Sequence, residues 1–446
     1  MTELSSAEAI AYIAPEQVAH RLTQAFGPER TQHAIGNHFR VGDEAARVIA
    51  YPHGIAELRE MLKFAAAEGW RIAPAGAGTW LEMGNRVAQF HLIVSTARMN
   101  RVLEYEPADL TCTVEAGVPL AAFNAQAAEH KQFIPLDPFG DEHSTIGATV
   151  ATGSYGPLRC AYGTPRDWLI GARVAHVDGT LTRAGGKVVK NVAGYDLCKL
   201  YAGSYGTLAI LGELSFKMRA LPAAERTLVF YAESFEPLTA LSARLMDSDL
   251  QPAAWELLSP QTGLPIDGAQ HALVLRFWNE ELETVEWQLD AARRLGEALS
   301  HTVLSETDAA AFWHAYHTSE TADEWTFSLR ATSLPSDVGA TLADAQRLMP
   351  NAVTRTHTAN GVVRIHGGDD LLDELRGKFR YKLLLELREA AQARGGQMLI
   401  LRAPDELKNQ LDVWGDPGAN AALLRGIKQQ YDPQGRLNYG RFVAGI

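Results

Sequence analysis

Cysteine is scarce in this sequence. Its 446 residues include three cysteines, Cys112, Cys160 and Cys198, which are odd in number and far apart. No Cys-x-x-Cys pair occurs, so a disulfide framework is not expected. An iron–sulfur cluster needs about four thiolates, and this chain therefore cannot build one alone. The pattern fits a reducing compartment, and we expect a cytoplasmic protein.

Long apolar runs and basic segments are also lacking. No stretch approaches the roughly 18 apolar residues of a membrane-spanning helix, and Glu8 interrupts an N-terminus without a positive start. We therefore expect no signal peptide and no direct membrane span, so that any membrane association runs through partner subunits. Lys and Arg number 41 against 53 Asp and Glu, a net charge of −12. This balance argues against nucleic-acid binding.

Apolar residues, by contrast, make up 46% of the chain, enough for a folded protein of about two or three domains. Hydrophobic spacing and turn residues predict alternating helices and strands in the first half. These are a helix at 5–28, strands at 48–51, 70–74 and 91–94 around a helix at 54–68, strands at 101–106 and 110–116, a helix at 119–130, a hairpin at 168–182 that turns at Asp178-Gly179, and a strand at 208–211.

The stretch 221–224 reads Leu-Pro-Ala-Ala and predicts a domain boundary. A second α+β domain is expected beyond it, followed by a last helix at 419–431. Its predicted strands lie near 226–231, 271–277, 325–331, 352–366 and 397–402, and its predicted helices near 236–247, 280–297, 335–348 and 370–394.

Glycine occurs 38 times and is concentrated in three clusters. The first, Pro-Ala-Gly-Ala-Gly-Thr at 74–79, follows a predicted strand but has Leu81 where a dinucleotide-binding fingerprint needs its third glycine. Gly185-Gly186-Lys187 is not a P-loop, because Leu181 and Val188 replace required residues. Residues 74–79 are therefore either a plain structural loop or a nest of backbone N–H groups for a pyrophosphate.

The second cluster, residues 144–156, is a long run of small residues with interleaved hydroxyl groups. We interpret it as too apolar for a flexible linker and too rich in glycine for a helix. Such a segment lets a large planar ligand lie against the backbone. The third cluster, 190–200 with 203–208, has the same character.

Taken together, the clusters resemble the FAD-binding domain of the vanillyl-alcohol oxidase type, also called the para-cresol methylhydroxylase (PCMH) type. The specific similarity is to the FAD-binding E subunit of bacterial glycolate oxidase (glycolate dehydrogenase). It is strong over 43–222, moderate over 405–446 and weak in between. The residues that carry it are 74–79, Thr-Ile-Gly-Ala-Thr-Val-Ala-Thr at 145–152, Tyr162-Gly163, Arg166-Asp167, Lys-Asn-Val-Ala-Gly-Tyr-Asp-Leu at 190–197, and the tail from Lys428 to Arg441.

This resemblance implies an α+β fold in which a two-subdomain FAD-binding domain spans 43–222, after an N-terminal helical extension at 1–42. An α+β cap or substrate domain would span 223–404. A C-terminal segment, 405–446, would pack back on the FAD domain.

The resemblance also implies which residues hold FAD. Many relatives attach the cofactor covalently through His or Cys near the first loop or the second cluster. The first loop here carries neither, and Cys160 is the thiol nearest the second cluster, so we expect noncovalent FAD. The expected contacts are Pro74, Ala75, Gly76, Ala77, Gly78, Thr79, Trp80, Pro138, Thr145, Gly147, Ala148, Thr149, Ala151, Thr152, Tyr155, Gly156, Gly206, Thr207 and Ile210.

The implied reaction is oxidation of a small 2-hydroxy acid to a 2-oxo acid. A carboxylate substrate favours an arginine fork, and its α-hydroxyl group needs a base. The catalytic candidates are Arg402, His366 as a base, and Tyr439, which stands where relatives usually have proline. Arg364 and Arg441 are further candidates, and surface or packing roles stay open for all of these residues.

No metal site is expected. His314 and His317 have the i, i+3 spacing of a helical ligand pair, but no further ligands lie near them in the sequence. The resemblance implies a second flavoprotein subunit and an iron–sulfur subunit as partners. Two alternatives stay open: a stand-alone FAD-dependent dehydrogenase of a 2-hydroxy acid or alcohol, and a non-catalytic FAD-binding scaffold.

Overall fold

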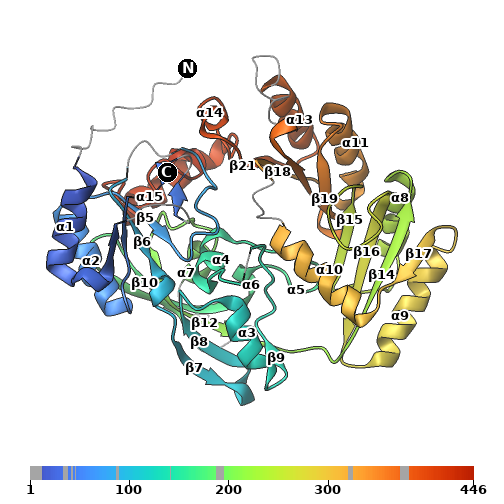
Figure 1. Ribbon diagram of the computed structural model, residues 1–446, viewed down its shortest axis with the longest axis horizontal. Helices are drawn as coiled ribbons and strands as arrows, with labels where there is room; N and C mark the ends of the chain where they lie inside the picture. The colour runs from blue at the N-terminus through green and yellow to red at the C-terminus, as the bar shows by residue number, and fades with distance from the viewer. Residues whose placement is uncertain are drawn as a thin grey trace.

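The computed structural model describes residues 13–33, 39–41, 44–45, 47–86, 90–140, 142–186, 195–319, 325–371 and 381–446. Three predicted segments fall partly outside them: the start of the helix at 5–28, residues 190–194 of the third glycine cluster, and residues 372–380 of the helix at 370–394. Figure 1 shows two lobes, one carrying the strands up to β13 and the other carrying β14 to β21. We call them the FAD lobe and the cap lobe.

The FAD lobe begins with a four-stranded sheet in the order β1-β4-β6-β5, in which β4, β6 and β5 are parallel. Helix α2 connects β4 to β5 and buries Leu58 and Leu62, so the predicted βαβ unit is confirmed. Helix α1 adds Val18 and Leu22 to the same core. The bounds are α1 (Pro15–Phe26), β1 (Thr31–His33), β4 (Val48–Ala50), α2 (Ile55–Ala67), β5 (Ile72–Ala75) and β6 (Leu92–Ser95).

A second sheet of five antiparallel strands has the order β11-β10-β12-β8-β7. The hairpin predicted at Asp178-Gly179 is confirmed, because β10 and β11 pair across this turn. The strands are β7 (Val102–Glu106), β8 (Thr111–Glu115), β10 (Leu169–Ala175), β11 (Leu181–Gly185) and β12 (Ile210–Lys217), with short pairs β2 (Arg40–Val41) and β3 (Glu44–Ala45), and β9 (Gln132–Phe133) and β13 (Arg219–Ala220). The helices are α3 (Leu120–Ala128), α4 (Ile146–Thr152), α5 (Arg159–Tyr162), α6 (Pro165–Trp168) and α7 (Leu197–Tyr201).

Helix α4 corrects the prediction that residues 144–156 contain too much glycine for a helix. Thr145 caps its N-terminus, with Oγ1 accepting a hydrogen bond from the Ala148 N–H at 3.3 Å, and Gly153 ends it at φ 64°. A Cβ on Gly147 would lie 2.6 Å from the Cβ of Ala116. Close packing on Ala116, the residue after β8, therefore offsets the roughly 1 kcal/mol that glycine costs in a helix relative to alanine.

The cap lobe is built on an eight-stranded antiparallel sheet in the order β17-β14-β16-β15-β19-β20-β18-β21. The strand predicted at 352–366 is in fact two strands, because Gly361 at φ 65° turns the chain between them. Strands β15 and β17 and helix α10 were not among the predicted elements. The strands are β14 (Ala224–Ala232), β15 (Ala254–Leu258), β16 (His271–Asn279), β17 (Ser300–Val303), β18 (Phe327–Thr332), β19 (Val353–His357), β20 (Val362–Gly367) and β21 (Met398–Arg402).

The two faces of the cap sheet differ in chemistry. Helices α8, α9, α11 and α13 cover the outer face, where Leu257, Leu275 and Ile365 join one large apolar cluster (Figure 1). The inner face is turned toward the FAD lobe and carries α10 over part of its width. The helices are α8 (Glu236–Met246), α9 (Leu282–Leu295), α10 (Glu306–Ser319), α11 (Val338–Leu348) and α13 (Tyr381–Ala393).

The C-terminal segment returns to the FAD lobe, as expected. Leu437 forms a parallel bridge with Ile72 of β5. The Ile72 N–H donates a hydrogen bond to the Arg436 carbonyl at 2.7 Å. The buried Lys428 ammonium donates to the Thr207 carbonyl at 2.7 Å and to Asp432 at 2.6 Å. In Figure 1 this segment, drawn in red, lies beside the blue strands β5 and β6.

The C-terminal elements are α14 (Asp405–Lys408) and α15 (Ala421–Tyr431). Short 3-10 helices complete the fold: η1 (Pro28–Arg30), η2 (Thr96–Arg98), η3 (Pro107–Asp109), η4 (Pro335–Asp337), η5 (Thr358–Asn360), η6 (Gly418–Asn420) and η7 (Val443–Gly445). Within the ranges given above, no helix has the length and apolar character needed to cross a membrane.

Candidate FAD and substrate site

A cleft of about 740 Å³ lies in the FAD lobe, between the end of β5, helix α4, the start of β12 and the C-terminal segment. Its walls are mostly small or apolar, as expected for a site that a large planar ligand fills. The lining residues are Pro74, Ala75, Gly76, Gly78, Thr79, Trp80, Leu81, Met83, Thr96, Ala116, Gly147, Ala148, Ala151, Thr152, Tyr205, Gly206, Ala209, Ile210, Leu211, Asn438 and Arg441.

The first glycine loop has the features of an anion nest. Ser95 donates to the Gly76 carbonyl at 2.8 Å and Thr96 to the Ala75 carbonyl at 3.2 Å, which ties the loop to the end of β6. The backbone N–H groups of residues 76–79 donate to no other described residue. Gly78 has φ 98°, a backbone conformation that favours glycine. These free N–H groups fit a pyrophosphate.

Arg441 is the one arginine or lysine among the cleft-lining residues. Its guanidinium group donates to the Leu81 carbonyl, to the Met83 carbonyl at 2.7 Å and to Asn438 Oδ1 at 3.0 Å. Burial lowers its pKa to about 10. Arg441 therefore fastens the C-terminal segment to the loop at 81–83 and closes one wall of the cleft.

Most of the predicted FAD contacts line this cleft: Pro74, Ala75, Gly76, Gly78, Thr79, Trp80, Gly147, Ala148, Ala151, Thr152, Gly206 and Ile210. The others, Ala77, Pro138, Thr145, Thr149, Tyr155, Gly156 and Thr207, are not among its lining residues. Several of these support the wall from behind. Thr145 caps α4, and Thr207 accepts the hydrogen bond of Lys428 through its carbonyl group.

The sequence did not lead us to assign Leu81, Met83, Thr96, Ala116, Tyr205, Leu211, Asn438 and Arg441 to the cofactor site, although they line the cleft. For Asn438 and Arg441 a signal was present, because both lie in the tail motif Asn-Tyr-Gly-Arg. Leu81 and Met83 directly follow the first loop. Ala116 could be found only from the packing of α4 on β8.

A second cavity, of about 380 Å³, joins the two lobes. It shares Thr79, Trp80 and Met83 with the cleft, so the two spaces adjoin. The cap contributes Ser328, Arg364, Leu401 and Arg402, and the FAD lobe adds Glu82. The second cavity thus places arginines from the cap beside the cofactor cleft.

The three catalytic candidates occupy different places. Arg402 lines the second cavity, with Nε 3.1 Å from Glu82 Oε2 and Nη1 donating to the Trp325 carbonyl at 2.9 Å. His366 is buried behind this cavity, with Nδ1 2.9 Å from Ser328 Oγ. Tyr439 lines neither space, and its ring lies 4.1 Å beneath the guanidinium group of Arg71.

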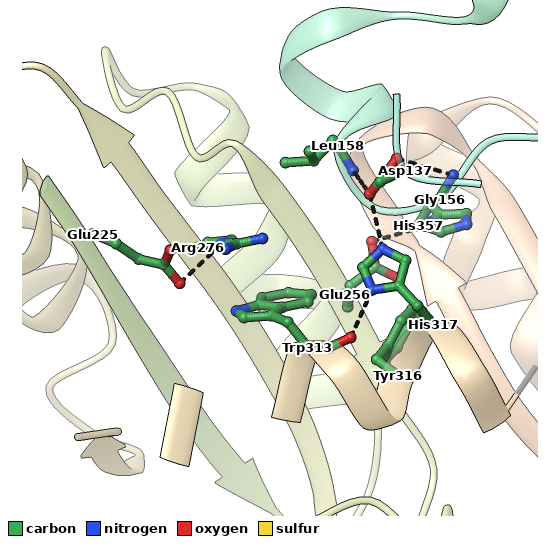
Figure 2. A network of polar contacts seen from close by, with 10 residues as sticks. All are labelled: Asp137, Gly156, Leu158, Glu225, Glu256, Arg276, Trp313, Tyr316, His317 and His357. Carbon is green, nitrogen blue, oxygen red and sulfur yellow. Dashed lines mark hydrogen bonds and ion pairs between the residues drawn. The ribbon is translucent and has the colours of Figure 1, made fainter. Parts of the chain in front are cut away.

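Helix α10 joins the cap to the FAD lobe through a side-chain hydrogen bond (Figure 2). His317 Nε2 lies 3.1 Å from Asp137 Oδ2. Asp137 also accepts from the N–H groups of Gly156 at 3.2 Å and Leu158 at 2.7 Å. His314, the other member of the i, i+3 pair, is exposed. Among the described residues no group of His, Cys, Asp and Glu is arranged to hold a metal ion.

A buried network continues behind this hydrogen bond. Glu256 Oε1 lies 2.7 Å from His357 Nδ1, and Glu256 Oε2 accepts a hydrogen bond from the Tyr316 hydroxyl at 2.5 Å (Figure 2). The His357 ring stacks on Phe139, with centroids 5.8 Å apart, and the Arg364 guanidinium carbon lies 4.2 Å from the centroid of Phe139. The network thereby fixes Arg364 at the wall of the second cavity.

Comparisons with known proteins agree with this geometry. Residues 46–185 match the model of an FAD-binding domain family. The chain is 34% identical to "Glycolate oxidase subunit GlcE" of Escherichia coli (strain K12), over 77% of this chain and 85% of that protein. This chain belongs to the FAD-binding glycolate oxidase subunit family.

Another relative shares nearly its whole length with this family member. It is "Glycolate oxidase subunit GlcD" of Bacillus subtilis (strain 168), 27% identical over 96% of this chain and 97% of that protein. Among solved structures, 4-ethylphenol oxidase from Gulosibacter chungangensis has a TM-score of 0.71 and 15% identity, over 96% of each chain. That likeness shows the fold, which is of the PCMH type. The protein is an FAD-dependent oxidoreductase of the glycolate oxidase and 2-hydroxy-acid dehydrogenase type.

Proposed function

We propose that this family member is the FAD-binding subunit of a glycolate oxidase or glycolate dehydrogenase complex and oxidises a small 2-hydroxy acid to its 2-oxo acid. The observation that carries the proposal is the second cavity. It adjoins the cofactor cleft at Thr79 and Trp80, and it carries Arg364 and Arg402 on its cap side. An anionic substrate bound there would lie between the arginines and the flavin.

The arginines of the second cavity have the chemistry to bind the carboxylate of the substrate. A guanidinium fork matches a carboxylate in two hydrogen bonds. Arg402 already holds a carboxylate, that of Glu82, whose side chain is 43% exposed. An incoming acid therefore competes with a carboxylate that solvent can reach. When bound, the flavin supplies the acceptor for a hydride equivalent from the α-carbon.

The proposed complex contains a second flavoprotein subunit and an iron–sulfur subunit. Two relatives are named as subunits of glycolate oxidase, which supports an assembly of several chains. The three cysteines are free and separate, so any iron–sulfur relay would need another chain. Free thiols also support a cytoplasmic location, with membrane contact only through partners.

The test is a substrate screen of the FAD-loaded chain, alone and together with the proteins that co-purify with it from its native host. The proposal expects an acid-dependent dye reduction that is much faster in the assembly and that prefers glycolate. Equal rates with and without the co-purified proteins would favour a stand-alone dehydrogenase. A flavin that no 2-hydroxy acid reduces, in either preparation, would favour the scaffold alternative and contradict the proposal.

A further inference from the structure

Three arginines lie side by side across the cap sheet. Arg355, Arg364 and Arg330 occupy directly opposed positions on β19, β20 and β18. Like charges at opposed positions destabilise a sheet, and a bound anion would relieve this repulsion. One alternation further along β20 and β18 are His366 and Ser328, and Ser328 lines the second cavity. The row therefore borders the proposed substrate site.

The members of this row have different surroundings. Arg355 donates to Ser319 Oγ at 2.9 Å and to the Thr262 carbonyl at 3.1 Å. Arg364 packs on Phe139, as described above. The Nε atoms of Arg355, Arg364 and Arg330 are all buried without a hydrogen-bond partner among the described residues. Arg330 differs in that its guanidinium group makes no hydrogen bond to any described residue, which leaves its other donors to a ligand as well.

Tyr155 faces this row from the FAD lobe. It follows α4 by three residues, close to Thr152 of the cleft wall, and is 9% exposed. Three guanidinium groups surround its ring, with their carbons at 4.1 Å (Arg159), 5.8 Å (Arg330) and 6.0 Å (Arg364) from the ring centroid. The His357 ring lies 6.0 Å away. The groups come from α5, β18, β20 and β19, so Tyr155 sits at the seam of the two lobes.

The electrostatics separate Tyr155 from its neighbour Tyr205. Burial raises the pKa of Tyr155, but Arg330, Arg159 and Arg364 lower it, and the net shift is downward from 10.0. Burial raises the pKa of Tyr205 to about 12, although Arg330 and Arg364 also act on it. Two groups whose pKa values are pushed apart are typical of a site with distinct acid and base roles. Tyr155 is the tyrosine of this pair that ionises more readily.

We propose that Arg330 binds the carboxylate of the acid together with Arg402 and that Tyr155 accepts the proton of its α-hydroxyl group. This proposal rests on the proposed function. In the reaction the O–H bond would break and its proton would pass to the ionised Tyr155 oxygen. The α C–H bond would break as well, and FAD, when bound, would supply the two-electron acceptor for the hydride. A C=O bond would form, so that the acid would lose a proton and a hydride.

The first test titrates the FAD-loaded protein without substrate, following tyrosinate absorbance in the ultraviolet. Four proteins are compared: wild type, Tyr155→Phe, Arg330→Met and the control Tyr105→Phe, which removes a phenol on β7 remote from the cleft. We expect a tyrosine that ionises below 10 in the wild type and the control. It should be missing in Tyr155→Phe and shifted upward in Arg330→Met. An unchanged titration in Tyr155→Phe would overturn the proposal.

The second test measures the pH dependence of kcat with glycolate. In the wild type kcat should rise with pH through the tyrosine ionisation seen in the titration. Tyr155→Phe should lose this rise and about 10²- to 10⁴-fold in kcat, the usual contribution of a positioned base. Arg330→Met should raise KM more than it lowers kcat, and Arg330→Lys should restore part of the loss. A Tyr155→Phe enzyme with the wild-type kcat and pH profile would contradict the assignment.

Flavin content and thermal melting show whether each variant is folded. If Tyr155→Phe does not fold, the titrations of Arg330→Met and Arg330→Lys still test the role of Tyr155. Only Arg330→Met removes the charge that favours the tyrosinate, so only this variant should shift the tyrosine ionisation upward. The two proposals fail in different ways. If no 2-hydroxy acid reduces the wild-type flavin, the proposed function is contradicted. If wild type is active but the variants match it, only the roles of Tyr155 and Arg330 are contradicted.

Discussion

His317 Nε2 and Asp137 Oδ2 lie 3.1 Å apart, and this hydrogen bond joins helix α10 of the cap to the FAD lobe. The His317 carbonyl also accepts from the Gly140 N–H at 3.2 Å, so two contacts meet at the same turn. The loop that carries Asp137 leads to Phe139, on which Arg364 packs. Docking of the cap and placement of Arg364 at the second cavity therefore depend on one short segment.

Asp137→Ala should destabilise the protein more than the loss of the His317 hydrogen bond alone would suggest. The buried N–H groups of Gly156 and Leu158 lose their acceptor, and each buried unsatisfied group costs about 1–3 kcal/mol. We expect the free energy of unfolding to fall by about 2 kcal/mol or more, measured by urea denaturation. His317→Gln should have a smaller effect, and the exposed Asp249→Asn should have almost none. Equal stability of the Asp137 and Asp249 variants would contradict this account.

Gly147→Val should abolish tight FAD binding. A Cβ at this position lies 2.6 Å from the Ala116 side chain and 2.7 Å from its carbonyl oxygen, so α4 must move out into the cleft. The measurement is the flavin absorbance of the purified protein after FAD is added. The control is Gly426→Ala in α15, where a Cβ meets nothing within 4 Å. A Gly147→Val protein that retains full flavin would show that α4 does not form the cofactor wall.

The FAD of this protein should be released by acid precipitation. Cys160, the thiol nearest the second glycine cluster, does not line the cleft, and its Sγ lies 3.5 Å from the Pro252 carbonyl oxygen of the cap. After precipitation the yellow colour should appear in the supernatant. Flavin that stays on the precipitated chain, and is lost in Cys160→Ser, would contradict the expectation of a noncovalent cofactor.

Stability should fall at alkaline pH because of the buried thiols. Burial raises the pKa of Cys112 and Cys160 to about 12 and that of Cys198 to about 11, from 9.0. Between these values the unfolded chain has lost thiol protons that the folded chain keeps, so the free energy of unfolding decreases as pH rises above about 9. Replacing all three cysteines by alanine should flatten this decrease in denaturation curves. An equally steep decrease in the triple variant would exclude the thiols as its cause.

Local pattern was sufficient for much of the fold. The βαβ unit around α2, the hairpin at Asp178-Gly179 and most strands of the cap follow from apolar spacing and turn residues. Helix α4 was predicted wrongly because its glycine is explained by contact with Ala116, a residue distant in the sequence. The C-terminal return was predicted from the family resemblance, and Lys428 and Leu437 show the contacts that hold it.

Site residues that belong to one continuous segment could be predicted from the sequence. Residues that distant segments bring together were harder to predict. Residues of the first glycine loop and of α4, which we predicted as FAD contacts, line the cleft. Arg330 was not considered, because its position beside Arg364 depends on the register of β18 and β20. Arg441 was considered for the substrate, whereas it braces Leu81 and Met83 across the cleft. Cross-strand register and contacts between distant segments are not visible in local sequence.

The central claim is that a 2-hydroxy acid, bound in the second cavity beside Arg364 and Arg402, reduces the FAD of this chain in the adjoining cleft. The most direct measurement is the rate at which flavin absorbance falls when FAD-loaded protein meets glycolate without oxygen, compared with glycolate deuterated at the α-carbon. The account predicts bleaching that is several-fold slower with the deuterated acid, because the α C–H bond breaks in this step. Flavin that glycolate, lactate and 2-hydroxyglutarate all leave oxidised, even in the presence of the co-purified partners, would contradict it.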